Sequence, residues 1–215
     1  EAGARRLPRT ELRGLWEVFD EVVERSGRPA PELWVSDSPS SNAYTFSDGK
    51  RGAILVTDGL MQAIPPRVAR GVIAHELGHL AQIDFAALRA FQEMRASAQR
   101  VVDTIWSISW HVTLYTWILG SPVLLFGIAA KLLWWLSDPL IRLVTAALHR
   151  ANEEFCDAVA VDLGYGEELR AYLRRYGGDE SSPWSSHPSS ARRQLLLAQR
   201  AASRAQFRAR RGCST

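Results

Sequence analysis

Residues 75–79 read His-Glu-Leu-Gly-His, and no other segment of this chain implies such specific chemistry. On a helix, His75 and His79 lie one turn apart on the same face, so their ring nitrogens can bind one Zn²⁺ ion. Glu76 lies beside that face, where its carboxylate can accept a proton from a water molecule at the metal. The spacing therefore predicts a metal, a nucleophile and a hydrolytic reaction together.

A catalytic zinc site needs a third protein ligand besides these two histidines. The next histidine after His79 is His111, which lies in an apolar run, so we expect a carboxylate from a second helix. Glu153 and Asp157 are four residues apart in a segment with helical periodicity. One of them could bind the metal while the other accepts a hydrogen bond from a ligating histidine.

Five separated blocks of the chain resemble the M48 family of zinc metallopeptidases, a gluzincin family that includes HtpX-like and CAAX prenyl proteases. The blocks are residues 42–46, 54–60 and 71–79, the pair Glu153 and Asp157, and Ser186-His187-Pro188 followed by Arg193. The resemblance implies a zincin-like fold and a zinc endopeptidase that acts on peptide or protein substrates.

The same resemblance implies roles for individual residues. It makes Glu153 the third zinc ligand and Asp157 the residue that orients a ligating histidine. It suggests His187 as a hydrogen-bond donor to the oxyanion, with Arg193 either orienting His187 or binding the substrate backbone. It also makes residues 52–57 an edge strand to which an extended substrate is added. The residues expected to bind substrate are Asn42, Ile54, Leu55 and Val56.

The periodicity of the chain predicts a mainly helical α+β fold, a single domain over residues 1–215 in which a small sheet accompanies the metal helix. The expected elements are a helix at 10–25, strands near 32–36, 42–47 and 52–57, a metal helix at about 66–85 that continues as a more polar helix to residue 100, a second ligand helix at 150–161, a helix near 166–176, and an Arg-rich helix or tail at 195–215.

Residues 104–130 contain no Asp, Glu, Lys or Arg. An uncharged run of this length that is rich in tryptophan is typical of a membrane-associated segment. HtpX-like members of the resembled family also carry membrane segments between the metal helix and the third ligand. The tryptophans in or just past this run are Trp106, Trp110, Trp117, Trp134 and Trp135.

This run must leave the site and return to it on one side, because His79 and Glu153 bind the same metal. Residues 120–122 supply a turn, so we expect a helical hairpin with legs at 103–119 and 122–136, inserted as residues 101–148. Each leg would be about 22–26 Å long, slightly short of the roughly 30 Å hydrocarbon core. The legs could span with thinning, lie obliquely, or form a soluble subdomain that packs as a lid or an oligomer interface.

The charge pattern places the expected catalytic side in the cytoplasm of a bacterial cell. Arginines flank the apolar run on both sides, as the positive-inside tendency requires. Among the 26 basic residues only Lys50 and Lys131 are lysines, which hints at a bacterial gene of high GC content. The formal net charge is +3, so we expect no nucleic-acid partner, and Cys156 and Cys213 do not make a disulfide framework.

Two other functions remain open at this level. One is a catalytically silent, membrane-associated scaffold of the same fold. The other is a module that binds lipid surfaces through its Arg-rich tail, in which Arg200, Arg204 and Arg208 form a stripe. The chain begins at Glu1 without a signal-peptide pattern and is expected to be a fragment or a processed form. Neither the oligomeric state nor the identity of the substrate can be read from the residues.

Overall fold

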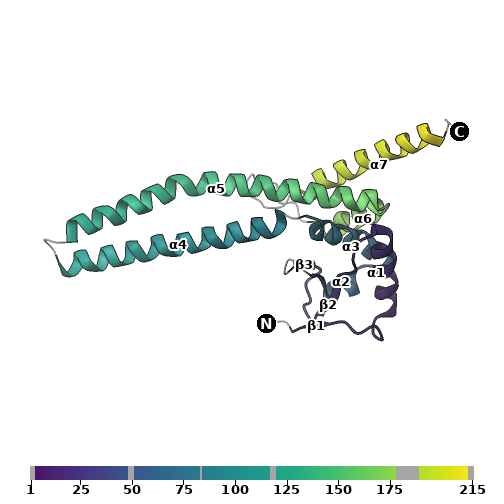
Figure 1. The fold of residues 1–215 in the computed structure, drawn as a ribbon, viewed down its shortest axis with the longest axis horizontal. Helices are drawn as coiled ribbons and strands as arrows, with labels where there is room; N and C mark the ends of the chain where they lie inside the picture. Colours follow the sequence, from purple (N-terminus) through teal and green to yellow (C-terminus); the bar gives the residue numbers. More distant parts are fainter. Residues whose placement is uncertain (1–2, 48–50, 83, 117–119, 178–188, 213–215) are drawn as a thin grey trace. The chain divides into compact units, whose positions relative to one another are not determined.

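The chain folds as two units, one made of residues 1–85 and 149–215 and the other of residues 86–148 (Figure 1). The structure is a computed structural model that describes residues 3–212 except 48–50, 83, 117–119 and 178–188. The predicted mainly helical α+β fold with a small sheet is confirmed. The second unit begins at residue 86, whereas the expected insertion begins at residue 101.

The first unit contains a four-stranded mixed sheet with the strand order β1-β2-β4-β3. The outer strand β1 is antiparallel to β2, β2 is parallel to β4, and β3 is antiparallel to β4. The strands are β1 (Ala4–Arg6), β2 (Glu32–Ser36), β3 (Ala43–Ser47) and β4 (Gly52–Thr57). The expected edge position of strand 52–57 is therefore wrong, because β4 pairs on both sides and β3 takes the edge.

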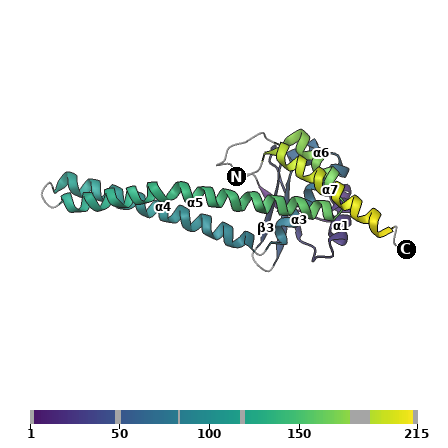
Figure 2. The ribbon, with the colours of Figure 1, turned by 90° about the horizontal axis from the view of Figure 1, so that it is seen from above.

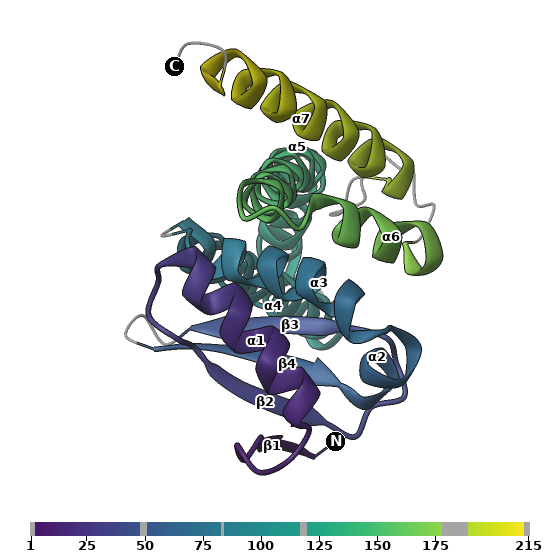
Figure 3. The ribbon, with the colours of Figure 1, turned by 90° about the vertical axis from the view of Figure 1, so that its right-hand side faces the viewer.

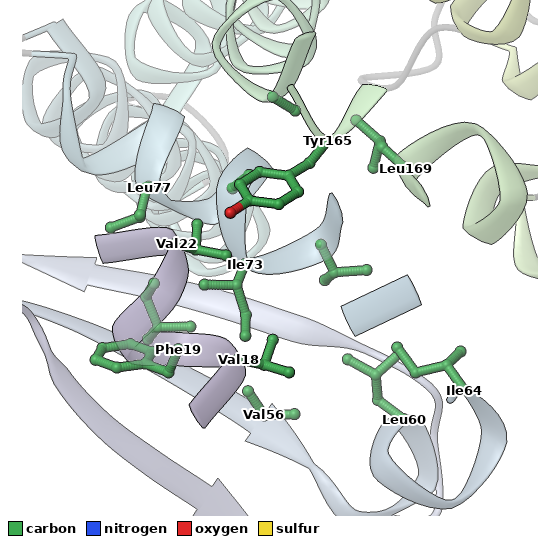
Figure 4. Packing of buried hydrophobic residues seen from close by; sticks show 14 of the residues in the cluster. Val18, Phe19, Val22, Val56, Leu60, Ile64, Ile73, Leu77, Tyr165 and Leu169 are labelled. Carbon is green, nitrogen blue, oxygen red and sulfur yellow. The ribbon is translucent and has the colours of Figure 1, made fainter. Parts of the chain in front are cut away.

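Two helices, α1 (Arg13–Ser26) and α3 (Pro66–Leu80), cover one face of this sheet (Figure 3). The apolar residues of α1 recur at helical spacing, and Phe19 and Val22 are completely buried there. They pack with Ile73 and Leu77 of α3 and with Val56 of β4 (Figure 4). Burial of these side chains fixes α3 against the sheet, and α3 is the helix that carries the His-Glu-Leu-Gly-His segment.

Three shorter elements complete the first unit. Helix α2 (Asp58–Ala63) begins at Thr57, whose hydroxyl accepts a hydrogen bond from the Leu60 amide. Helix α6 (Gly166–Tyr176) packs against α3, and α7 (Ser190–Gly212) packs against α6. The expected helix at 166–176 and the three expected strands are present, whereas β1 and α2 were not anticipated.

The metal helix is shorter than expected and the ligand helix is much longer. Helix α3 ends at Leu80, and a separate helix, α4 (Asp84–Tyr115), follows. Helix α5 (Gly120–Asp162) joins the second hairpin leg and the ligand helix into one element that contains Pro139. No glycine occurs between residues 128 and 163, so nothing there supplies the left-handed residue that commonly ends a helix. Gly164, with φ +89°, follows the helix.

The second unit is an antiparallel hairpin of α4 and α5, which lie side by side in two perpendicular views (Figures 1 and 2). Its legs are joined by ion pairs between Arg95 and Asp138 and between Asp103 and Lys131. Helix residues Pro122–Asp162 are long and apolar enough to cross a membrane by length and composition. The apolar hairpin expected before the third ligand is therefore present.

Gly71 lies where α3 closely approaches α6, and substitution of this glycine tests that contact. A Cβ atom at this position would lie 2.2 Å from the backbone nitrogen of Leu169, in the first turn of α6. Gly71→Ala is expected to lower the free energy of unfolding by about 1–3 kcal/mol, because backbone must move to admit the methyl group. Thermal or urea unfolding of the two proteins in parallel measures the difference.

Gly14→Ala is the matched control for this substitution. Gly14 also lies in a helix, but a Cβ atom there would meet nothing within 4 Å. This variant is expected to gain roughly 0.5–1 kcal/mol from helix propensity. Equal effects of the two substitutions would contradict the proposed close contact between α3 and α6.

Candidate metal and catalytic site

Three potential ligands converge between two helices of the first unit. Helix α3 presents His75 and His79 on one face, and α5 presents Glu153 toward them. One ligand atom from each of the three lies within 4.8 Å of the other two. The Nε2 atom of His75 is 3.5 Å from one Glu153 carboxylate oxygen, and the Nε2 atom of His79 is 3.7 Å from the other.

This arrangement fits a tetrahedral cation. Ligand bonds of about 2.0–2.1 Å at a tetrahedral metal place neighbouring ligand atoms roughly 3.3–3.4 Å apart. The separations between the histidine nitrogens and the carboxylate are close to that value, and the rings of His75 and His79 meet at 89°. Two imidazoles and one carboxylate are also a donor set that zinc prefers.

The other ring nitrogen of each histidine faces a side chain of α5. The Nδ1 atom of His75 lies 3.0 Å from a carboxylate oxygen of Asp157, and the Nδ1 atom of His79 lies 3.2 Å from the Cys156 sulfur. Partners of this kind orient the rings and leave both Nε2 atoms available to a metal. Close approach is helped by Gly78, where a Cβ atom would lie 2.7 Å from the Cys156 Cα atom.

Arg193 of α7 holds the two acidic residues of α5 in place. Its guanidinium donates two hydrogen bonds to Asp157, at 2.9 and 2.7 Å, and lies 3.0 Å from the Glu153 carboxylate. The Arg193 residue is only 9% exposed. The arginine therefore contacts the acidic residues of the site itself, and its expected action on His187 or on the substrate backbone stays a prediction. His187 lies outside the described residues.

Glu76 is buried beside the ligands and is held from the edge strand. The Thr45 hydroxyl of β3 forms a hydrogen bond with the Glu76 carboxylate and lies 3.3 Å from the Glu76 backbone oxygen. Burial raises the pKa of the Glu76 carboxyl above its usual value, against the opposing effects of His75 and Thr45. A carboxylate with a raised pKa is a better proton acceptor near neutral pH.

The site carries more buried negative than positive charge. Glu76, Glu153 and Asp157 are buried, and Arg193 is the permanent cation among them. With neutral histidines and ionised acids the net charge is −2, which one divalent cation would balance. Burying unbalanced charge is costly, so the composition of the site favours a bound divalent metal.

The residues expected to bind substrate occupy two different environments. Ile54, Leu55 and Val56 of β4 are buried, and Ile54 and Val56 belong to the hydrophobic core, so the structure does not support their assignment to a substrate surface. Asn42 lies just before the edge strand β3, where its side-chain amide donates to the Tyr44 hydroxyl. The edge strand itself is the surface that an extended chain could join.

Two contributors to the site were missed in the sequence. Thr45 lies inside the block 42–46, but its contact with Glu76 depends on the packing of β3 under α3. The sequence indicates for Cys156 only that it belongs to no disulfide framework, whereas in the structure it is buried and faces His79. Its position one residue before Asp157 was the available signal, since both face α3.

Three arginines of α7 bind α5 within the first unit. Arg192 pairs with the Glu154 carboxylate at 2.9 Å, and Arg200 donates to the Glu154 backbone oxygen at 2.8 Å. Arg204 donates to the Val161 backbone oxygen. Part of the Arg-rich stripe therefore binds the ligand-bearing segment of α5, including one carbonyl in its last turn.

Comparison with known proteins gives a matching peptidase family and similar proteases. The model of peptidase family M48 matches residues 10–201. A protease HtpX homolog of Dictyoglomus thermophilum is 36% identical over 176 residues, which cover 81% of this chain and 57% of the relative. A protease HtpX homolog of Tropheryma whipplei is 33% identical over 84 residues, which cover 39% of this chain and 29% of the relative.

The fold also resembles a solved structure. The crystal structure of S. mikatae Ste24p is similar with a TM-score of 0.66 and 20% sequence identity, over 91% of this chain and 52% of that one. At this identity the likeness shows the fold. The chain spans between about three tenths and somewhat more than half of the length of these relatives.

Metal affinity is expected to depend on pH through His75. Burial lowers the pKa of His75, but hydrogen bonds with Asp157 and Glu153 outweigh it and raise the value to about 9. The metal-free folded protein thus keeps a proton that the unfolded chain, with an ordinary histidine pKa of about 6.5, releases. A metal must displace that proton, so zinc affinity should rise about tenfold per pH unit from pH 7 toward 9.

Chelator competition at several pH values measures this slope, and unfolding of the metal-free protein supplies a control. Because the folded state holds the extra proton, the unfolding free energy of the metal-free protein should fall as pH rises from about 6.5 to 9. A zinc affinity that is constant from pH 7 to 9 would show that His75 is already neutral.

Proposed function

Because the chain belongs to peptidase family M48, we propose that it is a zinc-dependent endopeptidase that hydrolyses peptide bonds of protein or peptide substrates at or near a membrane. The observation that carries the proposal is the convergence of His75, His79 and Glu153 beside the buried carboxylate of Glu76. Ligands without a base would suggest a structural metal, and a base without ligands would suggest a buried core acid.

The side chains of the site divide the chemical work. Zn²⁺ held by His75, His79 and Glu153 would supply Lewis acidity toward water and the substrate carbonyl. Glu76 accepts the proton of the attacking water and delivers it to the leaving amine. The Thr45 hydroxyl fixes the Glu76 carboxylate by a hydrogen bond, so that the base need not reorient during the reaction.

The surrounding residues keep the ligands in register. Asp157 and Cys156 fix the two imidazole rings through their Nδ1 atoms. Arg193 fixes Asp157 and Glu153 by charge-assisted hydrogen bonds. We assign Arg193 this positioning role, and retain His187 as the proposed donor to the oxyanion on the basis of its Ser-His-Pro block.

Substrate binding is assigned to the edge strand β3. Among the described residues, this strand pairs with β4 and with no other strand, so it leaves backbone groups available to an extended peptide. Tyr44 and Phe46 are 45% and 43% exposed on it, while Thr45 points to Glu76. A peptide added to this edge would lie on the strand that contacts the base.

The proposed location is a bacterial membrane with the site on the cytoplasmic side. Its support is the apolar helix Pro122–Asp162 and the arginines on both sides of the apolar run. The alternative of a silent scaffold is disfavoured, because His75, Glu76, His79 and Glu153 are all present. The alternative of a lipid-binding tail loses support, because arginines of α7 bind α5.

The base is tested by Glu76→Gln. This variant is expected to retain zinc, since Glu76 is not a ligand, and to lose hydrolysis by a factor of about 10²–10⁴. Zinc content and cleavage of an unfolded model protein are measured on the same preparation. Wild-type protein that binds no zinc, or a variant that cleaves at the wild-type rate, would refute the proposed mechanism.

The third ligand is tested by two adjacent glutamates. Glu153→Gln removes a negatively charged ligand and is expected to weaken zinc binding by roughly a hundredfold or more, beyond the usual effect of an outer partner. Glu154→Gln is the matched control, because Glu154 turns away to Arg192. Its zinc affinity should match the wild type, and similar losses in both variants would argue against Glu153 as a ligand.

A further inference from the structure

We propose that the hairpin of residues 86–148 enters only one leaflet of a lipid bilayer, and that the ion pair between Asp103 and Lys131 marks the depth at which it stops. This inference rests on the membrane contact in the proposed function and goes beyond it. The partner is the leaflet itself, met by an apolar tip beyond the ion pair.

Three cross-contacts define levels along the hairpin. Arg95 of α4 pairs with Asp138 of α5 nearest the base of the hairpin, which is the end at residues 86 and 148. Asp103 and Lys131 follow, with a separation of 2.5 Å. Closest to the tip, the Ser109 side chain lies against Gly127, where a Cβ atom would be 2.6 Å from the Ser109 oxygen. These contacts between α4 and α5 set the register of the two legs. The pair of Asp103 and Lys131 is the charged contact closest to the tip.

The tip beyond this pair is about as long as one leaflet is thick. Helix α4 continues from Asp103 to Tyr115 and α5 begins at Gly120, and no Asp, Glu, Lys or Arg occurs in residues 104–130. At 1.5 Å per residue each leg of the tip measures about 17–18 Å. The hydrocarbon core is roughly 30 Å thick, so the tip can fill one leaflet but cannot cross both.

The surface of the tip is suited to lipid. Most of its described side chains are apolar, and the exposed ones include Leu114, Leu125 and Phe126, at 66%, 65% and 63%. His111 is also exposed there, and its ring contacts the Ser107 backbone oxygen one turn earlier. A cluster of polar groups is satisfied inside the helix itself: the hydroxyls of Ser109, Thr113 and Thr116 donate to carbonyls four residues earlier. Polar groups in hydrocarbon need such internal hydrogen bonds, because no water is present there to bind them.

Three tryptophans lie about one turn from the ion pair, and Trp110 lies a further turn toward the tip. Trp106 lies one turn from Asp103 toward the tip, and Trp134 and Trp135 lie one turn from Lys131 toward the base. Tryptophan is enriched where the hydrocarbon meets the headgroups. The aromatic side chains and the ion pair therefore indicate the same interface, close to residues 103 and 131.

The two legs differ on the base side of the ion pair. Helix α5 still exposes many apolar residues there, such as Leu136 and Leu140, at 62% and 65%. Helix α4 instead mixes the exposed apolar Met94 and Val101 with Gln92, Arg95 and Arg100. A segment that spans needs both legs apolar at every depth. A hairpin that enters obliquely from one surface, with α5 lying along the headgroups, needs only one apolar leg. The difference between the two legs therefore favours partial insertion.

A full span would place the ion pair in hydrocarbon. The distance from Asp138 to Gly120 is about 27 Å of helix, close to a full core, but the pair of Asp103 and Lys131 lies inside that length. Their side chains are 50% and 37% exposed on the hairpin surface, so they would face lipid and not a protein interior. Charged groups exposed to lipid at that depth are costly.

Depth is measured on the full chain with Cys213→Ser, reconstituted in phosphatidylcholine vesicles that contain phosphatidylglycerol. Thr116→Cys places a thiol at the exposed tip, and Ala98→Cys places one on the base side of Asp103 as the matched control. Each thiol is labelled with an environment-sensitive dye and quenched with nitroxide lipids of different depth. Membrane-impermeant maleimide is applied outside, or trapped inside, to test access from each side.

Partial insertion predicts that the dye at residue 116 is quenched most by mid-bilayer nitroxide and that its free thiol resists maleimide from both sides. The thiol at residue 98 should react from one side only. Reaction of the residue 116 thiol with maleimide from the side opposite to residue 98 would show a full span. Reaction of both thiols from the same side would show no insertion. Either result overturns the proposal.

Removing the ion pair tests the depth stop, and catalysis is measured separately. The double change Asp103→Leu and Lys131→Leu should let the residue 116 thiol become reactive from the far side, and an unchanged depth would contradict the assigned role of the pair. Glu76-dependent hydrolysis is followed in the same vesicles. A hairpin that spans the bilayer while hydrolysis is intact would contradict only the proposed depth. Partial insertion without hydrolysis would contradict only the proposed function.

Discussion

The charge-assisted hydrogen bonds between Arg193 and Asp157 link three helices that are distant in the sequence. Arg193 belongs to α7, Asp157 belongs to α5, and Asp157 in turn contacts His75 of α3. All three side chains are buried, and an unpaired charge at any of them would be costly. This requirement couples the positions of the helices, so the geometry of the metal ligands depends on the same contacts that stabilise the fold.

Glu76, the proposed proton acceptor, is held by a different part of the structure. Glu76 is held by Thr45 of the edge strand β3, whereas the ligands are held by α5 and α7. Helix α3 therefore lies between two supports, the sheet below it and the acidic face of α5 beside it. The same strand that fixes Glu76 leaves one edge unpaired among the described residues, which brings a peptide-binding edge and the proton acceptor together.

Much of the site could be predicted because its chemistry is local. His75 and His79 lie one turn apart in any helix, and Glu153 and Asp157 do the same, so each pair shares a face whatever the fold. The edge strand could not be predicted in this way. Residues 52–57 and 42–47 both read as strands, and the difference between them is that β4 also pairs with β2, a contact between distant segments.

The hairpin of α4 and α5 could also be predicted only in part. Its existence followed from the uncharged run between two ligands of one metal. The continuity of α5 through Pro139 was not anticipated, because a proline usually ends or kinks a helix. The ion pairs of Asp138 with Arg95 and of Asp103 with Lys131 were also not anticipated, since they join residues on opposite legs whose relative register only the folded hairpin sets.

By itself the sequence determined the metal motif, the two acids from which the third ligand is drawn, the mainly helical α+β class and the apolar insertion, since each depends on residue type and on periodicity within one element. Only the tertiary structure decided which strand is the edge, that Arg193 supports the ligands, and that Cys156 and Thr45 face His79 and Glu76. These are contacts between elements, and they are set by the packing of side chains far apart in the chain, which a local pattern does not encode.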